Sequence, residues 1–338
     1  MQEQTLALNV VAAAEEALTK SLGGPVRLQE TEVLRKAYRN SVLRCAVVEA
    51  PPEAPASVII KASVGEEETV FDPDRDLHGD PAWRFYNEWA GTRFLNDMSA
   101  SSPVCARLLA GNRDAGVIVL EDLGTGKSLS DLLQGDDFEA AKNGLERYAA
   151  SMGRLHAVTA GKEAAWRHVR SDIGGREAVR EREGARWLRD NVPPFRAQCA
   201  ALDIPLAAGF DAETEQVREI LDDPGPFLVF APGDTCPDNH RFVDDHYVRF
   251  FDFEFAGFQH ALLDASYLRV PFPTCWCVNR LPWELVSHLE TVYRAELIQG
   301  CPEAGEDKYF FRALVAVCAY WTVDSVGGNL ESALKRGR

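Results

Sequence analysis

The chain has 338 residues, of which 46% are hydrophobic and 26% charged, a composition typical of a soluble globular protein with about two domains or one two-lobed fold. The formal net charge of −16 argues against a nucleic-acid partner, because nucleic acids are bound by basic stripes. The same charge suits either a cationic substrate or a solubilising surface. Acidic residues Glu3, Glu15 and Glu16 interrupt the N-terminus, and no run approaches the roughly 18 apolar residues of a membrane span. We therefore expect a cytoplasmic protein without a membrane partner.

The eight cysteines are scattered along the chain and lack the paired Cys-x-x-Cys spacing of zinc sites. Without a secretory signal, we expect them to be reduced thiols. The short spacing of Cys275 and Cys277 could suggest a metal site, but no second ligand pair lies at zinc-site distance.

The first expected elements are a helix and two strands. Apolar residues at Leu6, Val10, Ala14 and Leu18 lie on one face of a helix. Strands are then expected around residues 26–29 and 46–49, on either side of a connection at Arg39-Asn40-Ser41.

A lone lysine ends the next strand. Residues 57–62 form a β-branched, apolar run in which Lys61 is the only charge. A lysine in that setting needs a charged partner, and Glu88, on an amphipathic helix expected over residues 82–96, is the candidate. The alternative is a solvated lysine at the strand end. Residues 65–81, which lie between, are acidic and turn-rich, and we expect an exposed insertion that is either a lid or simply solvated.

After a buried strand expected over residues 116–120, which stops at Glu121-Asp122-Leu123-Gly124, the chain is mostly helical. His156, on one of these helices, is either a catalytic base or a packed structural histidine. The expected helices cover residues 128–133, 138–158, 176–190, 281–298 and 310–321.

The most informative pattern lies in the C-terminal third. An apolar run at residues 226–230 enters a Pro-Gly-Asp turn, Asn239 follows Asp234 by five residues, and Asp252 follows Asn239 by thirteen. An expected hairpin with its turn at Asp244-Asp245 would bring these side chains to one end of a sheet. Amide and carboxylate oxygens suit Mg²⁺, and a second carboxylate can orient an alcohol and take its proton. Each residue alone could be a turn former, but the joint spacing indicates a phosphoryl-transfer centre.

Residues 227–268 resemble the aminoglycoside phosphotransferase and choline kinase superfamily, small-molecule kinases related to the protein kinases. Those families carry a His-Gly-Asp-x-x-x-x-Asn loop followed by an Asp-x-Glu or Asp-x-Asp strand. The resemblance implies that Asp234 is the catalytic carboxylate, that Asn239 and Asp252 are Mg²⁺ ligands, and that Glu254 supports a second metal or its waters. Pro232 replaces the usual His, so the loop is either held differently or catalytically weakened.

The literal triplet His78-Gly79-Asp80 is not followed by an Asn at the required position, and we interpret it as a surface turn. The resemblance further implies an α+β, two-lobed protein-kinase-like fold. Residues 1–122 would form a small antiparallel-sheet lobe that binds the nucleotide, and residues 123–338 a larger, mainly helical lobe that is catalytic and binds the substrate.

In that fold, Lys61 held by Glu88 positions the α- and β-phosphates of ATP, and backbone groups near Glu121 and Leu123 meet the adenine edge. The connection at Arg39-Asn40-Ser41 takes the place of the nucleotide-covering loop but contains no glycine, so it is either a phosphate-binding loop or an ordinary turn.

The function implied by the resemblance is ATP- and Mg²⁺-dependent phosphorylation of a hydroxyl group on a small molecule. The acceptor stays open between an aminoglycoside, choline or another amino alcohol, a sugar and a macrolide. ATP against GTP, and the oligomeric state, are equally open. The rival interpretations are a nucleotide-binding pseudoenzyme, favoured by Pro232 and the glycine-free loop, and an acidic binding protein with no nucleotide site.

Overall fold

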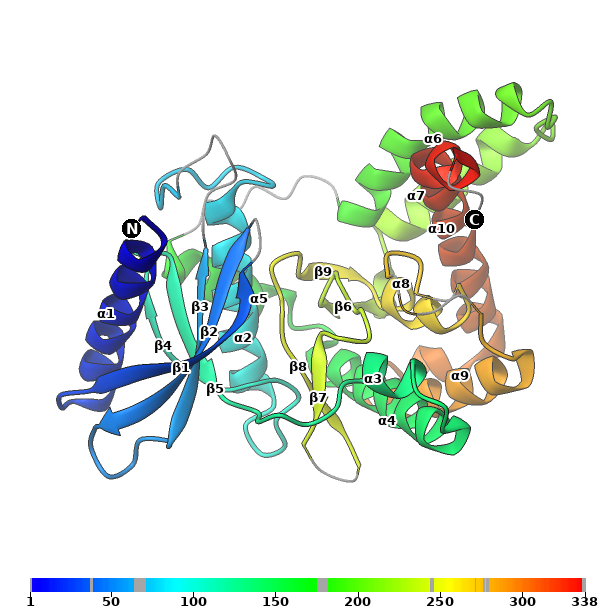
Figure 1. Cartoon of the computed structure of the whole chain (residues 1–338). Coiled ribbons are helices and arrows are strands. Elements are labelled where there is room, and N and C mark those ends of the chain that lie inside the picture. Colours follow the sequence, from blue (N-terminus) through cyan, green and yellow to red (C-terminus); the bar gives the residue numbers. More distant parts are fainter. Residues whose placement is uncertain are drawn as a thin grey trace. The chain divides into compact units, whose positions relative to one another are not determined.

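The structure is a computed structural model that describes residues 2–36, 39–63, 71–174, 182–243, 246–270, 272–275, 277 and 280–335. The chain divides into two compact units (Figure 1). The first contains residues 1–126, 164–177 and 241–256, and the second contains residues 127–163, 178–240 and 257–338. The first unit is built around an antiparallel sheet and the second is mainly helical, which confirms the expected α+β class. Two later segments return to the first unit, beyond the boundary expected at residue 122.

A five-stranded antiparallel sheet in the order β1-β2-β3-β5-β4 forms the centre of the first unit. The expected strands and the amphipathic helix are all present. The elements of this unit are α1 (Gln2–Leu22), β1 (Arg27–Lys36), β2 (Asn40–Glu49), β3 (Ser57–Ser63), α2 (Pro81–Met98), β4 (Leu108–Asn112), β5 (Val117–Glu121), α5 (Glu163–Ile173, from Ala164 on) and β8 (Val248–Phe250).

The period of two in β3 decides which way Lys61 faces. Val58, Ile60 and Ala62 are fully buried in a core that includes Ala14 and Leu18 of α1. Successive side chains of a strand point to opposite faces, so Lys61 lies on the face away from this core. Helix α2 also contacts β3, and Figure 1 shows α1 and α2 on opposite faces of the sheet. Lys61 and α2 are therefore on the same side.

The expected hairpin is present as β7 (His240–Phe242) and β8, which form a two-stranded sheet. Residues 244–245, where its turn was expected, lie outside the described residues. Backbone bonds between Val104, Ala106 and Phe250 attach β8 to the segment that leads into β4. This attachment places Asp252, two residues after β8, in the first unit.

The insertion before α2 is more firmly attached than its composition suggested. Residues 64–70 lie outside the described residues, but in the part that follows, Asp76 accepts a 2.8 Å hydrogen bond from Arg170 of α5. Both side chains are at most 4% exposed. The Tyr86 hydroxyl also donates to the Pro73 carbonyl at 2.7 Å. The expectation of a purely exposed stretch is wrong for Asp76, because a partner far away in the sequence buries it.

Helices form most of the second unit, where α4 packs against α9 and α6 against α10. Strands β6 and β9 form a short antiparallel pair, in which β6 contacts α4 and β9 contacts α6. The elements are α3 (Leu129–Leu133), α4 (Phe138–Thr159), α6 (Glu183–Ala201), α7 (Phe210–Asp222), β6 (Leu228–Ala231), β9 (Gly257–His260), α8 (Leu262–Ala265), α9 (Trp283–Leu297) and α10 (Asp307–Lys335), with short 3₁₀ turns at Gly225–Phe227, Ser266–Leu268 and Pro302–Gly305.

His156 is a structural histidine. It is fully buried, with Nδ1 2.8 Å from the Tyr293 hydroxyl and Nε2 3.3 Å from an Asp264 carboxylate oxygen. These contacts join α4, α8 and α9, so the ring serves the core of the helical unit. Of the two interpretations of His156, the packed residue is correct.

Within α10, Asp307–Gly327 is long and apolar enough to cross a membrane by length and composition alone. Among the described residues one helix has this property, with a mean hydropathy of 1.2 over the window and 44% of it buried. A core helix of a soluble protein passes the same test. Helix α10 packs against α6 and α7, and the Trp321 indole donates to the Leu263 carbonyl at 3.2 Å.

Candidate active site

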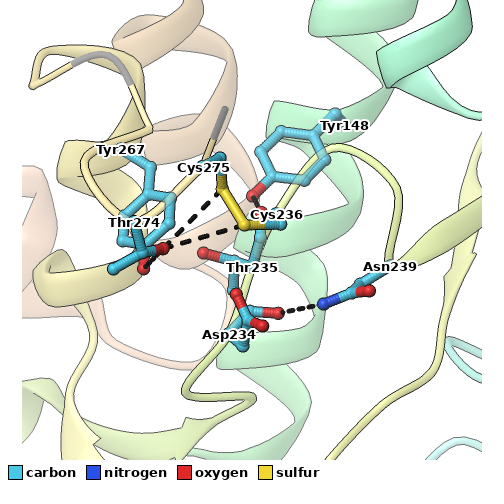
Figure 2. Close-up of a disulfide and its surroundings, with 8 residues drawn as sticks. All are labelled: Tyr148, Asp234, Thr235, Cys236, Asn239, Tyr267, Thr274 and Cys275. Carbon is cyan, nitrogen blue, oxygen red and sulfur yellow. Dashed lines mark hydrogen bonds between the residues drawn. A yellow bond between two sulfur atoms is a disulfide. The ribbon is translucent and has the colours of Figure 1, made fainter. Parts of the chain in front are cut away.

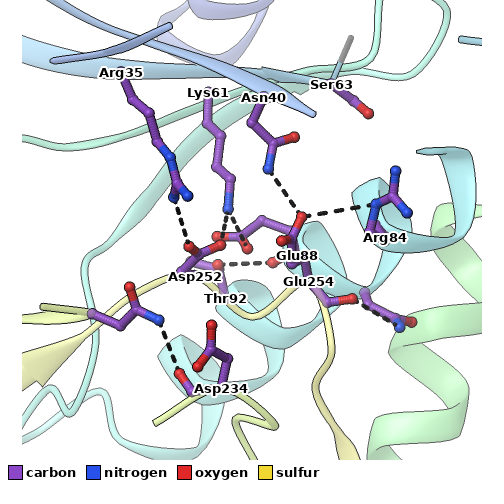
Figure 3. A network of polar contacts seen from close by, with 12 residues as sticks. Arg35, Asn40, Lys61, Ser63, Arg84, Glu88, Thr92, Asp234, Asp252 and Glu254 are labelled. Atoms are coloured by element: carbon purple, nitrogen blue, oxygen red, sulfur yellow. Dashed lines mark hydrogen bonds and ion pairs between the residues drawn. The ribbon is translucent and has the colours of Figure 1, made fainter. Parts of the chain in front are cut away.

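The first unit contains a lysine held between two carboxylates (Figure 3). The Lys61 ammonium lies 2.8 Å from Glu88 Oε2 on α2 and 2.5 Å from Asp252 Oδ1 after β8. The three side chains are 11%, 3% and 13% exposed, respectively. The ion pair that a lone strand lysine required is thus present, and a second carboxylate shares the ammonium. Such a cluster is expensive to bury unless the charges compensate each other.

Burial and mutual charge set the ionisation of these groups. Burial opposes the charge on Lys61, but the carboxylates of Asp252 and Glu88 outweigh it and raise the pKa of the ammonium. Burial raises the pKa of Glu88 to about 7, against the attraction of Lys61. Burial also opposes the charge on Asp252, yet Lys61 and Arg35 together lower the pKa of that carboxyl. The surroundings therefore favour the ionised form of Asp252 and disfavour the ionised form of Glu88.

Two further groups, both from the first hairpin, contact Asp252 and the nearby carboxylate of Glu254. The Asn40 amide donates to Glu254 Oε2 at 2.9 Å, and the Arg35 guanidinium lies 3.6 Å from Asp252 Oδ2. The guanidinium of Arg84 on α2 lies 3.9 Å from Glu254. Glu254 and Asp252 are therefore fixed by partners on the sheet and on α2, all within the first unit. Nothing in the sequence marked Arg35 as a site residue, because arginines are common on exposed strands.

The backbone at Asp252 has a positive φ of 72°. Few non-glycine residues adopt this left-handed conformation, although Asp is enriched among them, and it costs free energy that the surroundings must offset. The ion pair with Lys61 provides an interaction that holds the residue there. Outliers of this kind concentrate at functional sites, which makes Asp252 a candidate on backbone grounds alone.

The second unit carries the Asp234 loop. Strand β6 ends at Ala231, and Gly233, with a φ of 81°, turns the chain immediately before Asp234. Glycine adopts this conformation without the steric cost of a Cβ. The Asn239 amide then donates to the Asp234 carbonyl at 3.0 Å, so the NH₂ group closes the loop and its oxygen is the atom that a cation would take.

Other contacts hold this loop where Pro232 offers no donor (Figure 2). The buried Tyr148 hydroxyl donates to the Thr235 carbonyl at 2.8 Å, and the Ser130 N–H donates to the Pro237 carbonyl at 3.1 Å. Helices α3 and α4 therefore fix the loop backbone, as does the Asn239 bond. The loop is therefore held by contacts that need no donor from Pro232.

A disulfide adds a further restraint and corrects the expectation of reduced cysteines throughout. Cys236, two residues after Asp234, is bonded to Cys275, 39 residues later in the chain. The Thr274 hydroxyl lies 3.7 Å from both sulfur atoms and 2.9 Å from the Tyr267 hydroxyl. The remaining six cysteines are free thiols. The sequence analysis did not predict this pair, because the positions of two cysteines in the sequence do not show whether they lie close together in the fold.

The adenine contact expected of Glu121 and Leu123 stays a prediction. Glu121 ends β5, and its N–H donates to the Arg107 carbonyl at 2.8 Å. Its carboxylate accepts from Arg249 at 2.9 Å. The Glu121 N–H is therefore not available to an adenine, and a contact by this residue would have to use an acceptor oxygen. Leu123 lies two residues beyond the strand.

The chemistry of the donor set fits the implied nucleotide and cation. Within the first unit, Asp252 and Glu254 offer only oxygen atoms to a metal, which is the preference of Mg²⁺, and Lys61 and Arg35 are cations that suit phosphate oxygens. In the second unit, Asn239 offers an amide oxygen. One Glu88 oxygen is buried without a hydrogen-bond partner among the described residues. His78-Gly79-Asp80 is a turn preceding α2, as expected.

No protein-family model matches the chain, and no curated protein matches it. Solved structures do. An ethanolamine kinase from Plasmodium vivax superposes with a TM-score of 0.50 at 11% identity, over 92% of this chain and 76% of that one. The ADP-bound aminoglycoside phosphotransferase APH(2'')-Ib gives a TM-score of 0.50 at 14% identity, over 93% and 89%. At these identities the similarity establishes the fold, and the expected kinase-like fold is confirmed.

Proposed function

We propose that the protein is a phosphotransferase that uses ATP and Mg²⁺ to phosphorylate a hydroxyl group of a small molecule. The observation that carries this proposal is the buried cluster in which Lys61 is shared by Glu88 and Asp252. Phosphoryl transfer depends mainly on positioning and charge neutralisation, and a fixed lysine beside metal-ligand carboxylates supplies both. The kinase-like fold is consistent with this chemistry.

We assign the contacts with the nucleotide phosphates to the first unit. Lys61 would donate to the α- and β-phosphate oxygens while Glu88 keeps the ammonium in place. Asp252 would hold Mg²⁺, which neutralises phosphate charge when bound, and Glu254 would orient a second ion or its waters. Asn239, which belongs to the second unit, is the further Mg²⁺ ligand that the family resemblance implies. The first connection lacks the glycines that let backbone amides approach phosphates. We assign part of that task to Arg35, whose guanidinium already lies beside Asp252.

Asp234 would act on the acceptor. Its carboxylate would accept a hydrogen bond from the substrate hydroxyl, orient the oxygen toward the phosphorus and take the proton late in the transfer. Gly233, Asn239 and Tyr148 fix the backbone on both sides of this residue, so the carboxylate is held by a rigid loop. Preorganisation of this kind lowers the barrier because no reorganisation is needed at the moment of reaction.

Two observations bear on the chemical class of the acceptor. The two solved structures quoted above carry the names of an ethanolamine kinase and an aminoglycoside phosphotransferase, and both names denote amine-bearing alcohols. The net charge of −16 also favours a cationic acceptor. We therefore propose amino alcohols and aminoglycosides as the first classes to screen, with sugars and macrolides next.

The proposal is tested by mass-spectrometric detection of phosphorylated products, with ATP, Mg²⁺ and a panel of these alcohols. With acceptors of one class, the wild-type protein should yield a product whose mass exceeds that of the acceptor by one phosphoryl group. The D234A variant should lose turnover by about a hundredfold or more while it still binds nucleotide, because proton acceptance and orientation are worth 10² to 10⁴. Magnesium-dependent ATP binding without any product would indicate a pseudoenzyme, and D234A with wild-type turnover would remove Asp234 from the role.

A further inference from the structure

A cluster of potential metal ligands lies at the Asp234 loop itself. One carboxylate oxygen of Asp234 and the sulfur atoms of Cys236 and Cys275 all lie within 4.8 Å of one another, and all three residues are half-buried (Figure 2). We infer that, when the disulfide is reduced, these three residues bind a thiophilic divalent cation such as Zn²⁺. The three residues belong to the same unit, so the site is complete within it.

The distances suit that class of ion. Zinc binds sulfur at about 2.3 Å and carboxylate oxygen at about 2.0–2.2 Å in a tetrahedron, so neighbouring ligands lie roughly 3.3–3.8 Å apart. Three ligand atoms already within 4.8 Å reach that geometry by rotation of side chains. The sulfurs themselves must move apart once their bond is broken. Half-buried ligands leave access for the ion and for a water at the fourth position.

The groups around the two sulfur atoms suit a metal site with thiolate ligands, and not a second Mg²⁺ site with oxygen ligands. The Thr274 hydroxyl, 3.7 Å from each sulfur, can donate to a thiolate, and outer hydrogen bonds of this kind orient metal ligands. Two thiolates and one carboxylate select Zn²⁺ over Mg²⁺, which prefers oxygen alone. The predicted Zn²⁺ site therefore differs in its ligand atoms from the oxygen ligands assigned to Mg²⁺, although one of its ligands is the carboxylate of Asp234.

The oxidation state decides whether the site exists. In the disulfide, each sulfur is bonded to the other and offers no thiolate. A dithiol reductant converts the disulfide to two thiols and is itself oxidised to a disulfide, which balances the two electrons. On cation binding the two thiols release their protons and become thiolates. The oxidised protein should therefore be indifferent to Zn²⁺, and the reduced protein should bind one ion.

The consequence for activity rests on the proposed function. A cation bound to Asp234 occupies the carboxylate that would accept the substrate proton, so Zn²⁺ should inhibit the reduced enzyme. The disulfide protects Asp234 from this capture. Cation binding itself is measured without turnover, so the metal site and the proposed activity can fail separately.

The test is Zn²⁺ binding to reduced, desalted protein in competition with a chromophoric chelator, with Co²⁺ as a spectroscopic probe of thiolate coordination. Reduced wild type should bind one Zn²⁺ and show sulfur-to-cobalt charge-transfer absorption. C275S and C236S, examined separately so that one folding failure does not decide the result, should each bind at least tenfold more weakly and show a clearly weaker absorption per bound Co²⁺, because one of the two thiolates is lost. D234N should weaken Zn²⁺ binding and retain the absorption.

The matched control is C318S, which removes a half-buried thiol elsewhere in the same unit and should bind like wild type. The inference is overturned if reduced wild type binds no Zn²⁺, or if C275S and C236S bind as tightly as wild type. If the Zn²⁺ site is present but no acceptor is phosphorylated, the proposed function fails and the site stands. If turnover is found, Zn²⁺ should inhibit reduced wild type more strongly than C275S, each relative to its own activity without zinc.

Discussion

Replacement of Glu88 by glutamine should make the protein more stable above neutral pH. Glutamine keeps the shape of the side chain and can still accept a hydrogen bond from Lys61, but it carries no charge into a buried site. In the native protein three carboxylates, those of Glu88, Asp252 and Glu254, act on Lys61, and Glu88 is the one whose ionised form burial disfavours. The substitution removes that unfavourable ionisation.

The magnitude follows from the raised pKa. Burial raises the pKa of Glu88 from 4.5 to about 7, and each pKa unit corresponds to about 1.4 kcal/mol, so the ionised carboxylate costs about 3 kcal/mol in the folded state at pH 8. The folded protein holds this proton more tightly than the unfolded chain does. The contribution of Glu88 to stability therefore falls as the pH rises from about 4.5 through about 7 and is constant above that window. The variant lacks this dependence.

Urea denaturation of wild type and E88Q at pH 8 and pH 5 measures the effect. The variant should be more stable by about 3 kcal/mol at pH 8 and by no more than about 1 kcal/mol at pH 5. Substitution of the exposed Glu16 by glutamine is the control and should leave the midpoint nearly unchanged at both values. A less stable E88Q at pH 8, or a difference that does not vary with pH, would refute the reasoning. In the proposed function E88Q should also bind nucleotide more weakly, so stability would be gained at the expense of activity.

Two further substitutions test other parts of the structure. Asp76→Ala leaves Arg170 buried without its carboxylate partner and should destabilise the protein by about 3–5 kcal/mol in urea, whereas Asp74→Ala, at an exposed ion pair with Arg113, should change the midpoint little. Equal effects of the two would show that Asp76 is not a structural anchor. Arg35→Ala should weaken binding of ATP with Mg²⁺ by about three- to tenfold in calorimetry, because one charge-assisted contact from a mostly exposed side chain is lost. Arg75→Ala removes an exposed arginine of the same unit and should bind like wild type, and an R35A variant that does the same would exclude a phosphate contact.

Local patterns were sufficient for the elements and for one ion pair. The β-branched, apolar run at residues 57–62 predicts β3, and because Lys61 is its only charge, the need for a charged partner follows from electrostatics. Glu88 is the carboxylate that the structure places there. The turn before Asp234 was equally readable, since Pro-Gly-Asp after an apolar run is a turn with a known mechanism.

Contacts between distant segments were not readable. Asp76 and Arg170 are 94 residues apart, and each looks like a solvated charge in its own surroundings. Cys236 and Cys275 are likewise joined by the fold and not by spacing. Arg35 approaches Asp252 only because β1 and the end of β8 meet in the same unit. In each case tertiary packing determines which residues become partners, and the local sequence of neither residue predicts its partner.

The most direct test of the central claim is the thermal stability of wild type and Asp252→Ala with ATP, each with and without Mg²⁺. A ligand at about a hundred times its dissociation constant adds roughly 2.7 kcal/mol, which is a visible rise in melting temperature. We expect wild type to show a Mg²⁺-dependent rise and D252A to lose most of it, because the variant lacks a carboxylate that holds the ion. No shift of wild type at millimolar ATP, or the same Mg²⁺-dependent shift in D252A, would contradict the account.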